Sequence, residues 1–312
     1  MTLTPLIPGG RTVDVLFFNS MWGTYPDVDA DVAAGVPCRF TSDRSTFDTA
    51  DLVVFHLPTL QTPIEMRKRR GQLWAAFSME SEVTTPALAD PVFMDQFDLT
   101  ATYKRDADVW MPYVGIGSLP ALMQPPAPKT ETWPIAHFQS NPFDLSGRTA
   151  YVAQLMGHIK VASYGRILTT VPGRDIQTRD ARLDFCGRHK FTLAFENTIA
   201  HDYVSDKFFD ALIAGSVPIY LGAPNVADFA PAPESFINVA DYAGPAELAE
   251  HLRYLDLHPA EYERLLAWKR TGPSTQFLEL LGEVPRHGFC RLAELVRRMQ
   301  PERRPCPLAS PS

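Results

Sequence analysis

The sequence FTLAFENTIAHDYVSDKFFDALIAGSVPIYLG, residues 191–222, indicates the fold class of this chain. An apolar strand, a polar loop, an amphipathic helix and a second apolar strand follow one another, which is the order of a parallel βαβ unit. Phe191–Phe195 is the expected first strand, Ser205 the N-cap of the helix and Gly215 its stop. The stretch therefore predicts an α/β fold built around a parallel sheet.

Polar residues follow the first strand directly, at the edge where a parallel sheet presents its ligand-binding loops. These residues are Glu196 and Asn197. The start of the helix faces the same crevice, and its unpaired backbone N–H groups and dipole attract anions. Lys207 adds a positive charge in the first turn. The spacing predicts a binding site for a pyrophosphate.

Three short segments of this stretch carry a resemblance to a known family. They are Phe195-Glu196-Asn197-Thr198, Asp202–Lys207 and Gly215–Pro218. Together they resemble the donor-binding signature of the α-1,3-fucosyltransferases, glycosyltransferase family 10, which use GDP-fucose. The register matches without gaps from Glu196 to Lys207. The resemblance implies a GT-B type α/β fold, in which two Rossmann-like domains face a central cleft.

The resemblance also implies roles for the donor-side residues. Lys207 is expected to pair with phosphate, and Asn197 to hydrogen-bond the donor. Tyr203 is expected to pack against the donor through its ring and hydroxyl, with core packing as the alternative. Glu196 would either fix the loop or contact the fucose. Asp206 stands where the family has a Glu that holds the ribose hydroxyls, so the carboxylate is kept with a shorter reach.

A second cation is expected from another segment. Ser140-Asn141 and Gly147–Tyr151 resemble the family segment whose Arg contacts the donor diphosphate, which makes Arg148 the corresponding residue. An Arg near a helix start opposes the helix dipole, so an anionic partner would explain its placement. An Arg that simply faces solvent is the alternative.

Glycosyl transfer from a nucleotide sugar needs a base for the acceptor hydroxyl and positive charge for the diphosphate leaving group. Met79-Glu80-Ser81 follows an apolar run and resembles the Leu-Glu-Ser-Pro segment of the family, which makes Glu80 the expected base. The match departs at Glu82, where the family has Pro, and this leaves Glu82 as a rival. Without the resemblance, an exposed loop carboxylate would be the favoured interpretation. Further similarity follows downstream in Phe97–Tyr103, Arg105–Asp108 and Pro112-Tyr113.

The 312 residues suggest two domains, at roughly 150 residues per domain. The Pro- and Gly-rich run at 111–134 is the expected crossing between them. The expected division is an N-terminal acceptor-side α/β domain at 1–134, a C-terminal GDP-sugar-binding Rossmann-like domain at 135–300 and a disordered tail at 301–312. Further strands are expected at 13–18, 51–57, 73–79, 135–139, 161–168, 217–221 and 235–239. Further helices are expected at 64–70, 151–159, 245–268 with a break near Pro259, and 288–299.

Composition excludes several classes of protein. A net charge of -7 argues against nucleic acid as a partner. No window approaches the ~18 apolar residues of a membrane span, and 1–11 lacks the pattern of a signal peptide. The four scattered cysteines suggest neither a zinc site nor a disulfide framework, which favours a reducing compartment. We therefore expect a soluble cytoplasmic protein. Animal members of the resembled family carry a membrane anchor, so the resemblance implies a soluble form of the bacterial type.

The helix expected at 288–299 is basic and amphipathic. It places Phe289, Leu292, Val296 and Met299 on one face. Packing of this face against the body of the protein is expected, with weak peripheral contact to the inner membrane as the alternative.

The resemblance implies an inverting fucosyltransferase that moves L-fucose from GDP-fucose to a hydroxyl of a glycan acceptor. The expected linkage is α-1,3 or α-1,4 to GlcNAc of an N-acetyllactosamine-type oligosaccharide or a lipopolysaccharide O-chain. No cofactor beyond the donor substrate is expected, and no divalent metal, because the Asp-x-Asp spacings at 27–31 and 106–108 lie outside the donor motif. Two alternatives are a different nucleotide-sugar donor, motivated by Asp206, and a sugar-nucleotide-binding protein without catalysis.

Overall fold

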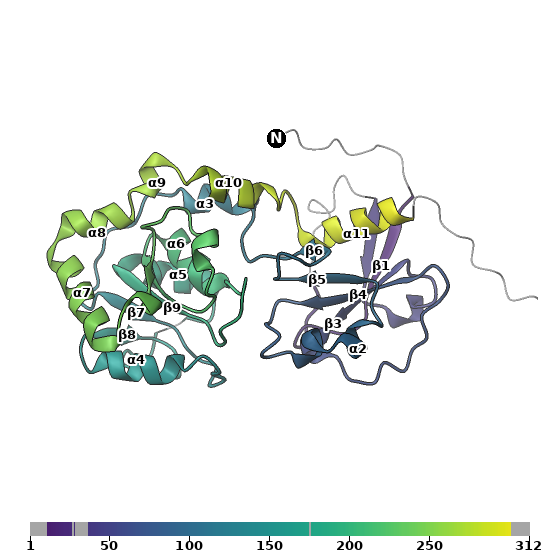
Figure 1. Cartoon of the computed structure of the whole chain (residues 1–312), viewed down its shortest axis with the longest axis horizontal. Helices are drawn as coiled ribbons and strands as arrows, with labels where there is room; N and C mark the ends of the chain where they lie inside the picture. Colours follow the sequence, from purple (N-terminus) through teal and green to yellow (C-terminus); the bar gives the residue numbers. More distant parts are fainter. Residues whose placement is uncertain (1–10, 27, 29–36, 175, 301–312) are drawn as a thin grey trace, which may run out of the picture. The chain divides into compact units, whose positions relative to one another are not determined.

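The structure is a computed structural model that describes residues 11–26, 28, 37–174 and 176–300 (Figure 1). The tail expected at 301–312, residues 1–10 and the aspartates at positions 27, 29 and 31 lie outside the described residues. The chain forms two compact units. Unit 1 comprises Met1–Met111 and Arg286–Ser312, and unit 2 comprises Pro112–Pro285.

This division differs from the expected one at both ends. The chain enters unit 2 at Pro112, ahead of most of the Pro-rich run, and it returns to unit 1 at Arg286. The return has a packing reason, because the last helix, α11 (Gly288–Met299), buries Phe289, Leu292 and Val296 in the core of unit 1. The expected assignment of residues 286–300 to the C-terminal domain was therefore wrong.

Unit 1 contains a six-stranded parallel sheet in the order β2-β1-β3-β4-β5-β6. Strand β3 is buried along its whole length, as expected for a central parallel strand covered on both faces. The strands are β1 (Val13–Phe17), β2 (Cys38–Thr41), β3 (Leu52–His56), β4 (Leu73–Ser78), β5 (Leu99–Thr102) and β6 (Val109–Trp110). Short helices connect them: η1 (Arg44–Thr46), η2 (Leu57–Thr59), η3 (Pro86–Ala89) and α2 (Pro91–Met94).

The side chains of β1 alternate between two cores, as the two-residue period of a strand requires. Val13, Val15 and Phe17 face the core that includes α11. Leu16 belongs to the opposite core, together with Phe55. Both faces of the sheet are therefore apolar and covered.

The helix expected at 64–70 does not form. The segment offers Ile64 and Met66 as its apolar residues ahead of four consecutive cations, so it has no stripe to bury along a helix. Its cations reach carboxylates in different places instead: Lys68 lies 2.8 Å from Asp98, and Arg69 lies 3.4 Å from Asp48. These ion pairs hold an irregular segment.

Unit 2 contains a five-stranded parallel sheet in the order β11-β10-β9-β7-β8. The strands are β7 (Ile135–His137), β8 (Val161–Ser163), β9 (Phe191–Phe195), β10 (Val217–Leu221) and β11 (Ile237–Asn238). The helices are α3 (Leu119–Leu122), α4 (Arg148–Met156), α5 (Arg179–Arg188), α6 (Asp206–Ala214), α7 (Pro245–Leu257), α8 (Pro259–Leu265), α9 (Trp268–Thr271) and α10 (Thr275–Gly282). Three short turns of 3-10 helix complete the unit: η4 (Ile116–Ser118), η5 (Val226–Phe229) and η6 (Val239–Asp241).

The βαβ unit that decides the fold forms as expected. Strands β9 and β10 have the expected bounds and pair in parallel, with Phe191 opposite Val217. Ser205 caps α6 by accepting a hydrogen bond from the backbone N–H of Lys207, and Gly215 ends the helix with a left-handed φ of 72°. Helix α6 lies against β9 and α5 (Figure 1).

Candidate functional site

The order of the strands in unit 2 predicts where a ligand binds. From β7 the chain proceeds outward to β8, whereas from β9 it proceeds in the other direction to β10 and β11. The reversal lies between β7 and β9, and in open parallel sheets the crevice at such a switch point, beyond the carboxyl ends of the strands, is the usual binding place. The loop that leads to Arg148 follows β7, and Glu196 and Asn197 follow β9.

Glu196 is the hub of the loop between β9 and α6. Its side chain is 0% exposed. Its carboxylate accepts hydrogen bonds from Ser205 through the backbone N–H at 2.8 Å and through Oγ at 2.7 Å, and Lys207 Nζ lies 3.1 Å away. These partners offset the cost of burying the charge. Of the two expected roles, the structure gives Glu196 that of fixing the loop.

Lys207 is held at the start of α6. Its Nζ donates to Ser205 Oγ at 2.9 Å, and its side chain remains about one-third exposed. Burial lowers the pKa of Lys207, but the charges of Glu196 and Asp206 outweigh this and raise it overall. The group therefore presents a fixed cation at a helix N-terminus, as the sequence predicted.

The loop between β7 and α4 is hydrogen-bonded to the residues that follow β9. Ser146 Oγ donates to the backbone carbonyl of Glu196 at 2.6 Å, and the backbone N–H of Leu145 donates to that of Asn197 at 2.8 Å. Asp144 accepts from the backbone N–H groups of Arg148 and Thr149, at 3.1 and 2.8 Å, and so caps the start of α4. Asp144 was missed as a cap because the helix was expected to begin at Tyr151, whereas it begins at Arg148.

Arg148 does not face solvent, so that alternative is wrong. It is 5% exposed, and its guanidinium donates to the backbone carbonyls of Phe195 at 3.0 Å and Phe143 at 3.2 Å. Burial lowers its pKa, against the opposing charges of Asp144 and Glu196. Within the described part of the chain its buried Nε has no hydrogen-bond partner. An orphaned buried donor of this kind fits an anionic ligand.

Among the described residues, Asn197 has an unpaired hydrogen-bond acceptor, whereas Arg148 has an unpaired donor. Its Oδ1 is buried and accepts no hydrogen bond from the residues that the structure describes.

Tyr203 is 2% exposed, and its ring meets the ring of Tyr113 edge-on, with 6.5 Å between the ring centroids. The core-packing alternative therefore describes the ring of Tyr203.

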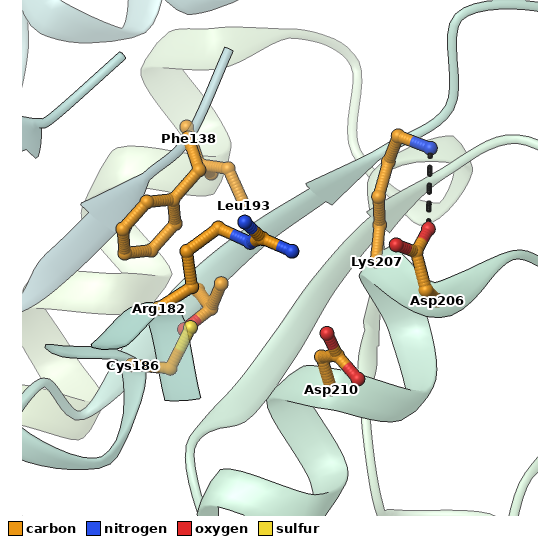
Figure 2. A pocket seen from close by; sticks show the side chains of 8 residues that line it. Phe138, Arg182, Cys186, Leu193, Asp206, Lys207 and Asp210 are labelled. Carbon is orange, nitrogen blue, oxygen red and sulfur yellow. Dashed lines mark ion pairs between the residues drawn. The ribbon is translucent and has the colours of Figure 1, made fainter. Parts of the chain in front are cut away.

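A pocket of about 200 Å³ opens beside the start of α6 (Figure 2). Asp206 and Lys207 contribute to its wall, and Asp206 is 54% exposed there, 3.7 Å from Lys207 Nζ. In Figure 2 the guanidinium of Arg182 extends into the space between Phe138 and Lys207. The lining residues are Phe138, Arg182, Cys186, Thr192, Leu193, Asp206, Lys207 and Asp210.

The pocket brings together residues that the sequence did not single out. Arg182 and Cys186 come from α5, a helix that was not predicted. Asp210 lies one turn into α6 and pairs with Arg179 at 2.6 Å. Arg148 and Asn197 are not part of this lining. Helix α5 could not be found by periodicity, since its sequence RDARLDFCGR has no apolar stripe.

Glu80 lies in unit 1, just beyond the carboxyl end of β4. It is half-buried, and Ser78 Oγ both accepts from its backbone N–H at 3.0 Å and donates to its carbonyl at 2.9 Å. The rival Glu82 hydrogen-bonds Tyr103 Oη and lies 3.3 Å from Lys104 Nζ. Burial raises the pKa of Glu82, but these contacts lower it overall. A carboxylate held in this way is a weaker base.

The described residues include neither a candidate membrane-spanning helix nor a candidate metal site. No helix in the described ranges is long and apolar enough to cross a membrane. Across the same ranges no three His, Cys, Asp or Glu side chains converge as a metal site would require. The apolar face of α11 is buried in unit 1 apart from Met299, so the peripheral membrane contact would have to use its cationic side.

Comparisons with known proteins agree with this architecture. The model of "Glycosyltransferase family 10 (fucosyltransferase) C-term" matches residues 127–307, and that of "Fucosyltransferase, N-terminal" matches residues 11–114. A fucosyltransferase-like protein of Arabidopsis thaliana is 36% identical over 67% of this chain and 42% of its own length. The human 4-galactosyl-N-acetylglucosaminide 3-alpha-L-fucosyltransferase FUT6 is 35% identical over 75% of this chain and 66% of its own length. The chain thus spans about two fifths to two thirds of these relatives.

The fold has a counterpart among solved structures. A crystal structure of an α1,3-fucosyltransferase with GDP-fucose superposes with a TM-score of 0.60 at 18% identity, over 85% of this chain and 84% of that one. This likeness concerns the fold, which is of the GT-B type with a parallel α/β sheet in each unit. One family model alone spans more than half of the chain. The chain therefore belongs to glycosyltransferase family 10, the fucosyltransferases.

Proposed function

We propose that this chain is an inverting fucosyltransferase that moves L-fucose from GDP-fucose to a hydroxyl of a glycan acceptor. Membership of the family supports the reaction class. The observation that carries the proposal is the fixed cation of Lys207 at the start of α6, held by Glu196 and Ser205 at the switch point of the sheet. Such a site suits the diphosphate of a nucleotide sugar.

Each group has a defined task in the proposed reaction. Glu80 takes the proton of the acceptor hydroxyl as that oxygen attacks C1 of the fucose from the side opposite the diphosphate, which converts the β-linked donor into an α-linked product. The bond from C1 to the diphosphate oxygen breaks, and Lys207, Arg148 and the N–H groups at the start of α6 stabilise the charge of the departing GDP. No general acid is needed, because the leaving group is already anionic.

The nucleoside and the sugar are proposed to use the remaining polar groups. Asp206 is exposed at the rim of the pocket, where its carboxylate can accept hydrogen bonds from the ribose hydroxyls. Asn197 Oδ1, which has no partner in the described structure, is proposed to accept from the donor. Glu196 acts by positioning Ser205 and Lys207.

The proposed acceptor hydroxyl belongs to GlcNAc in an N-acetyllactosamine-type glycan, with an α-1,3 or α-1,4 linkage. The names of the fucosyltransferase relatives support this class. We further propose a soluble bacterial enzyme of the cytoplasm that acts on an oligosaccharide or a lipopolysaccharide O-chain. Catalysis is proposed to proceed without a divalent metal, so turnover should persist when a chelator is present.

Calorimetry and a product assay test the proposal together. GDP-fucose should bind more tightly than UDP-galactose, and Lys207→Met should weaken this binding at least tenfold, since a charge-assisted contact is lost. Lys160→Met, a matched change elsewhere in unit 2, should leave it unaltered. Glu80→Gln should keep donor affinity and lose transfer of labelled fucose to N-acetyllactosamine.

Each result that would contradict the proposed function points to a different alternative. Normal transfer by Glu80→Gln would mean that another group is the base. Tight donor binding without product from the unmodified chain, across a panel of acceptor glycans, would favour the non-catalytic alternative. Tighter binding of another nucleotide sugar would favour the alternative donor.

A further inference from the structure

The segment that carries Glu80 continues into a tight turn. The carbonyl of Ser81 accepts hydrogen bonds from the backbone N–H groups of Thr84 at 3.0 Å and Thr85 at 2.8 Å, and from Thr84 Oγ1 at 2.9 Å. Ser81 is completely buried. Glu82 therefore occupies the second position of the turn that begins at Ser81, two residues beyond Glu80.

Two residues that follow the neighbouring strand β5 bind this turn through the carboxylate of Glu82. One carboxylate oxygen of Glu82 accepts a hydrogen bond from Tyr103 Oη, and the other lies 3.3 Å from Lys104 Nζ. Tyr103 and Lys104 directly follow β5, which pairs with β4 in parallel register, with Ser78 opposite Thr102. We call the contacts of Glu82 with Tyr103 and Lys104 the Glu82 clamp. The clamp joins the loop after β4 to the loop after β5, at the same edge of the sheet.

The clamp is anchored in the body of unit 1. Tyr103 is buried, and its backbone carbonyl accepts from Trp110 Nε1 at 2.9 Å. Charge-assisted hydrogen bonds to a carboxylate are stronger and geometrically more restrictive than neutral ones. A rigid clamp two residues from Glu80 limits where the Glu80 backbone can lie.

We propose that Glu82 is a positioning residue for the reaction: held by Tyr103 and Lys104, it fixes the turn that presents Glu80 to the acceptor hydroxyl. The inference rests on the proposed function, because it concerns the residue proposed as base. It assigns the two carboxylates separate tasks, proton transfer to Glu80 and orientation to Glu82.

Substitutions at position 82 separate orientation from proton transfer. Glu82→Ala should lower kcat roughly ten- to hundredfold, the order expected from a misplaced catalytic group, with an unchanged KM for GDP-fucose. Glu82→Gln keeps an oxygen that accepts from Tyr103, so it should retain most of the activity. Glu82→Pro should recover much of what Glu82→Ala loses, because proline is favoured at the second position of such a turn and restricts it without the clamp.

A double-mutant cycle provides a readout that a general loss of stability would not give. If Glu82 acts through Glu80, the variant Glu80→Gln/Glu82→Ala should be no slower than Glu80→Gln alone. Asp43→Ala is the matched control, since Asp43 also fixes a turn of unit 1, by accepting from the backbone N–H of Ser45 at 2.9 Å. It should leave kcat unchanged.

The opposite results would overturn the inference. Wild-type kcat in Glu82→Ala would show that the clamp is not needed. Inactivity of Glu82→Gln together with no rescue by Glu82→Pro would make Glu82 the base itself. Fully additive losses in the cycle would mean a structural effect independent of Glu80. Absence of transfer by the unmodified chain would instead refute the proposed function, before any variant is compared.

Discussion

Glu196 and Lys207 form an ion pair whose two ends meet different surroundings. The carboxylate is wholly buried, whereas the lysine side chain is about one-third exposed. Ser205 bonds the carboxylate twice, so the loop keeps two restraints when the lysine is absent. The ammonium group of Lys207 is therefore accessible to a ligand, while Glu196 holds the loop through Ser205. Accessibility to a ligand and stability of the loop thus depend on different residues.

Replacement of the lysine tests this separation. Lys207→Met should lower the unfolding free energy of unit 2 by about 1–3 kcal/mol, because a buried carboxylate loses its cation. Adding Glu196→Gln should recover part of the loss, since the charge is then removed as well. Urea unfolding measures both. Arg264→Met, which breaks exposed ion pairs with Glu234 and Glu261, is the control and should have little effect. Equal losses of unfolding free energy in Lys207→Met and Arg264→Met would refute this separation.

The buried His137 should make the unfolding free energy of unit 2 depend on pH. It is buried at the end of β7, with Nδ1 2.9 Å from Ser163 Oγ. Burial, assisted by the charge of Arg148, lowers its pKa to about 4, whereas an unfolded histidine titrates near 6.5. Between these values the unfolded state binds the proton and the folded state does not. Unit 2 should therefore lose stability as the pH falls through this window, by at most about 1.4 kcal/mol per pH unit from this residue.

Urea unfolding at about pH 7 and about pH 5 checks this expectation. His137→Asn should reduce the difference between the two pH values, because the titrating group is gone. His158→Asn, at an exposed histidine of the same unit, serves as the control. An unaltered pH difference in His137→Asn would show that other groups cause it.

At the scale of elements, α6 is fixed at both of its ends. Ser205 and Glu196 order its start, and Gly215 ends it in the left-handed conformation. Lys129 Nζ donates to the backbone carbonyls of Gly215 at 2.7 Å and Gly187 at 2.8 Å, so one cation caps the carboxyl ends of α6 and α5. The start and the carboxyl end of α6 are thus held by different residues.

Gly215→Ala should destabilise unit 2 by two additive effects. A Cβ would strain the backbone at φ 72° and would lie 2.8 Å from Pro126 Cα. Gly272→Ala meets only the first effect, because φ is 90° there and nothing lies within 4 Å of the added atom. We expect about 1 kcal/mol for Gly272→Ala and at least about 1 kcal/mol more for Gly215→Ala, measured by urea unfolding. Equal costs would mean that the backbone near Pro126 shifts without an energetic penalty.

Unit 1 is built from two segments that lie far apart in the sequence. Helix α11 comes after the whole of unit 2 in sequence and packs in the core that contains β1. Unit 1 is therefore incomplete until α11 has been made.

Leu292→Ala tests which unit depends on α11. Leu292 is completely buried, so its truncation should cost about 2–5 kcal/mol and should speed amide hydrogen exchange in β1 and β3. Leu248→Ala in α7 is the matched variant, with an equally buried leucine, and should act on β9 and β10 instead. Faster exchange in β9 and β10 caused by Leu292→Ala would contradict the division into units.

The strands that the sequence predicted well are those with long apolar runs. Phe191–Phe195 and Leu52–His56 are buried at every position, so composition alone marks them. Strand β2, Cys38–Thr41, was missed because it is a short edge strand with a charged and exposed residue. Helix α5 was missed because its burial involves few apolar side chains.

Local sequence patterns were enough to predict the parallel βαβ unit, its caps and the cation at the helix start, because these features depend on residues close together in the chain. The packing of distant segments places Tyr203 in the core, buries Glu196 inside the loop, and brings Arg182 and Asp210 to a pocket with Lys207. It also decided that α11 returns to unit 1. Burial and partner choice between distant segments depend on which surfaces meet in space, and local sequence patterns carry no information about that.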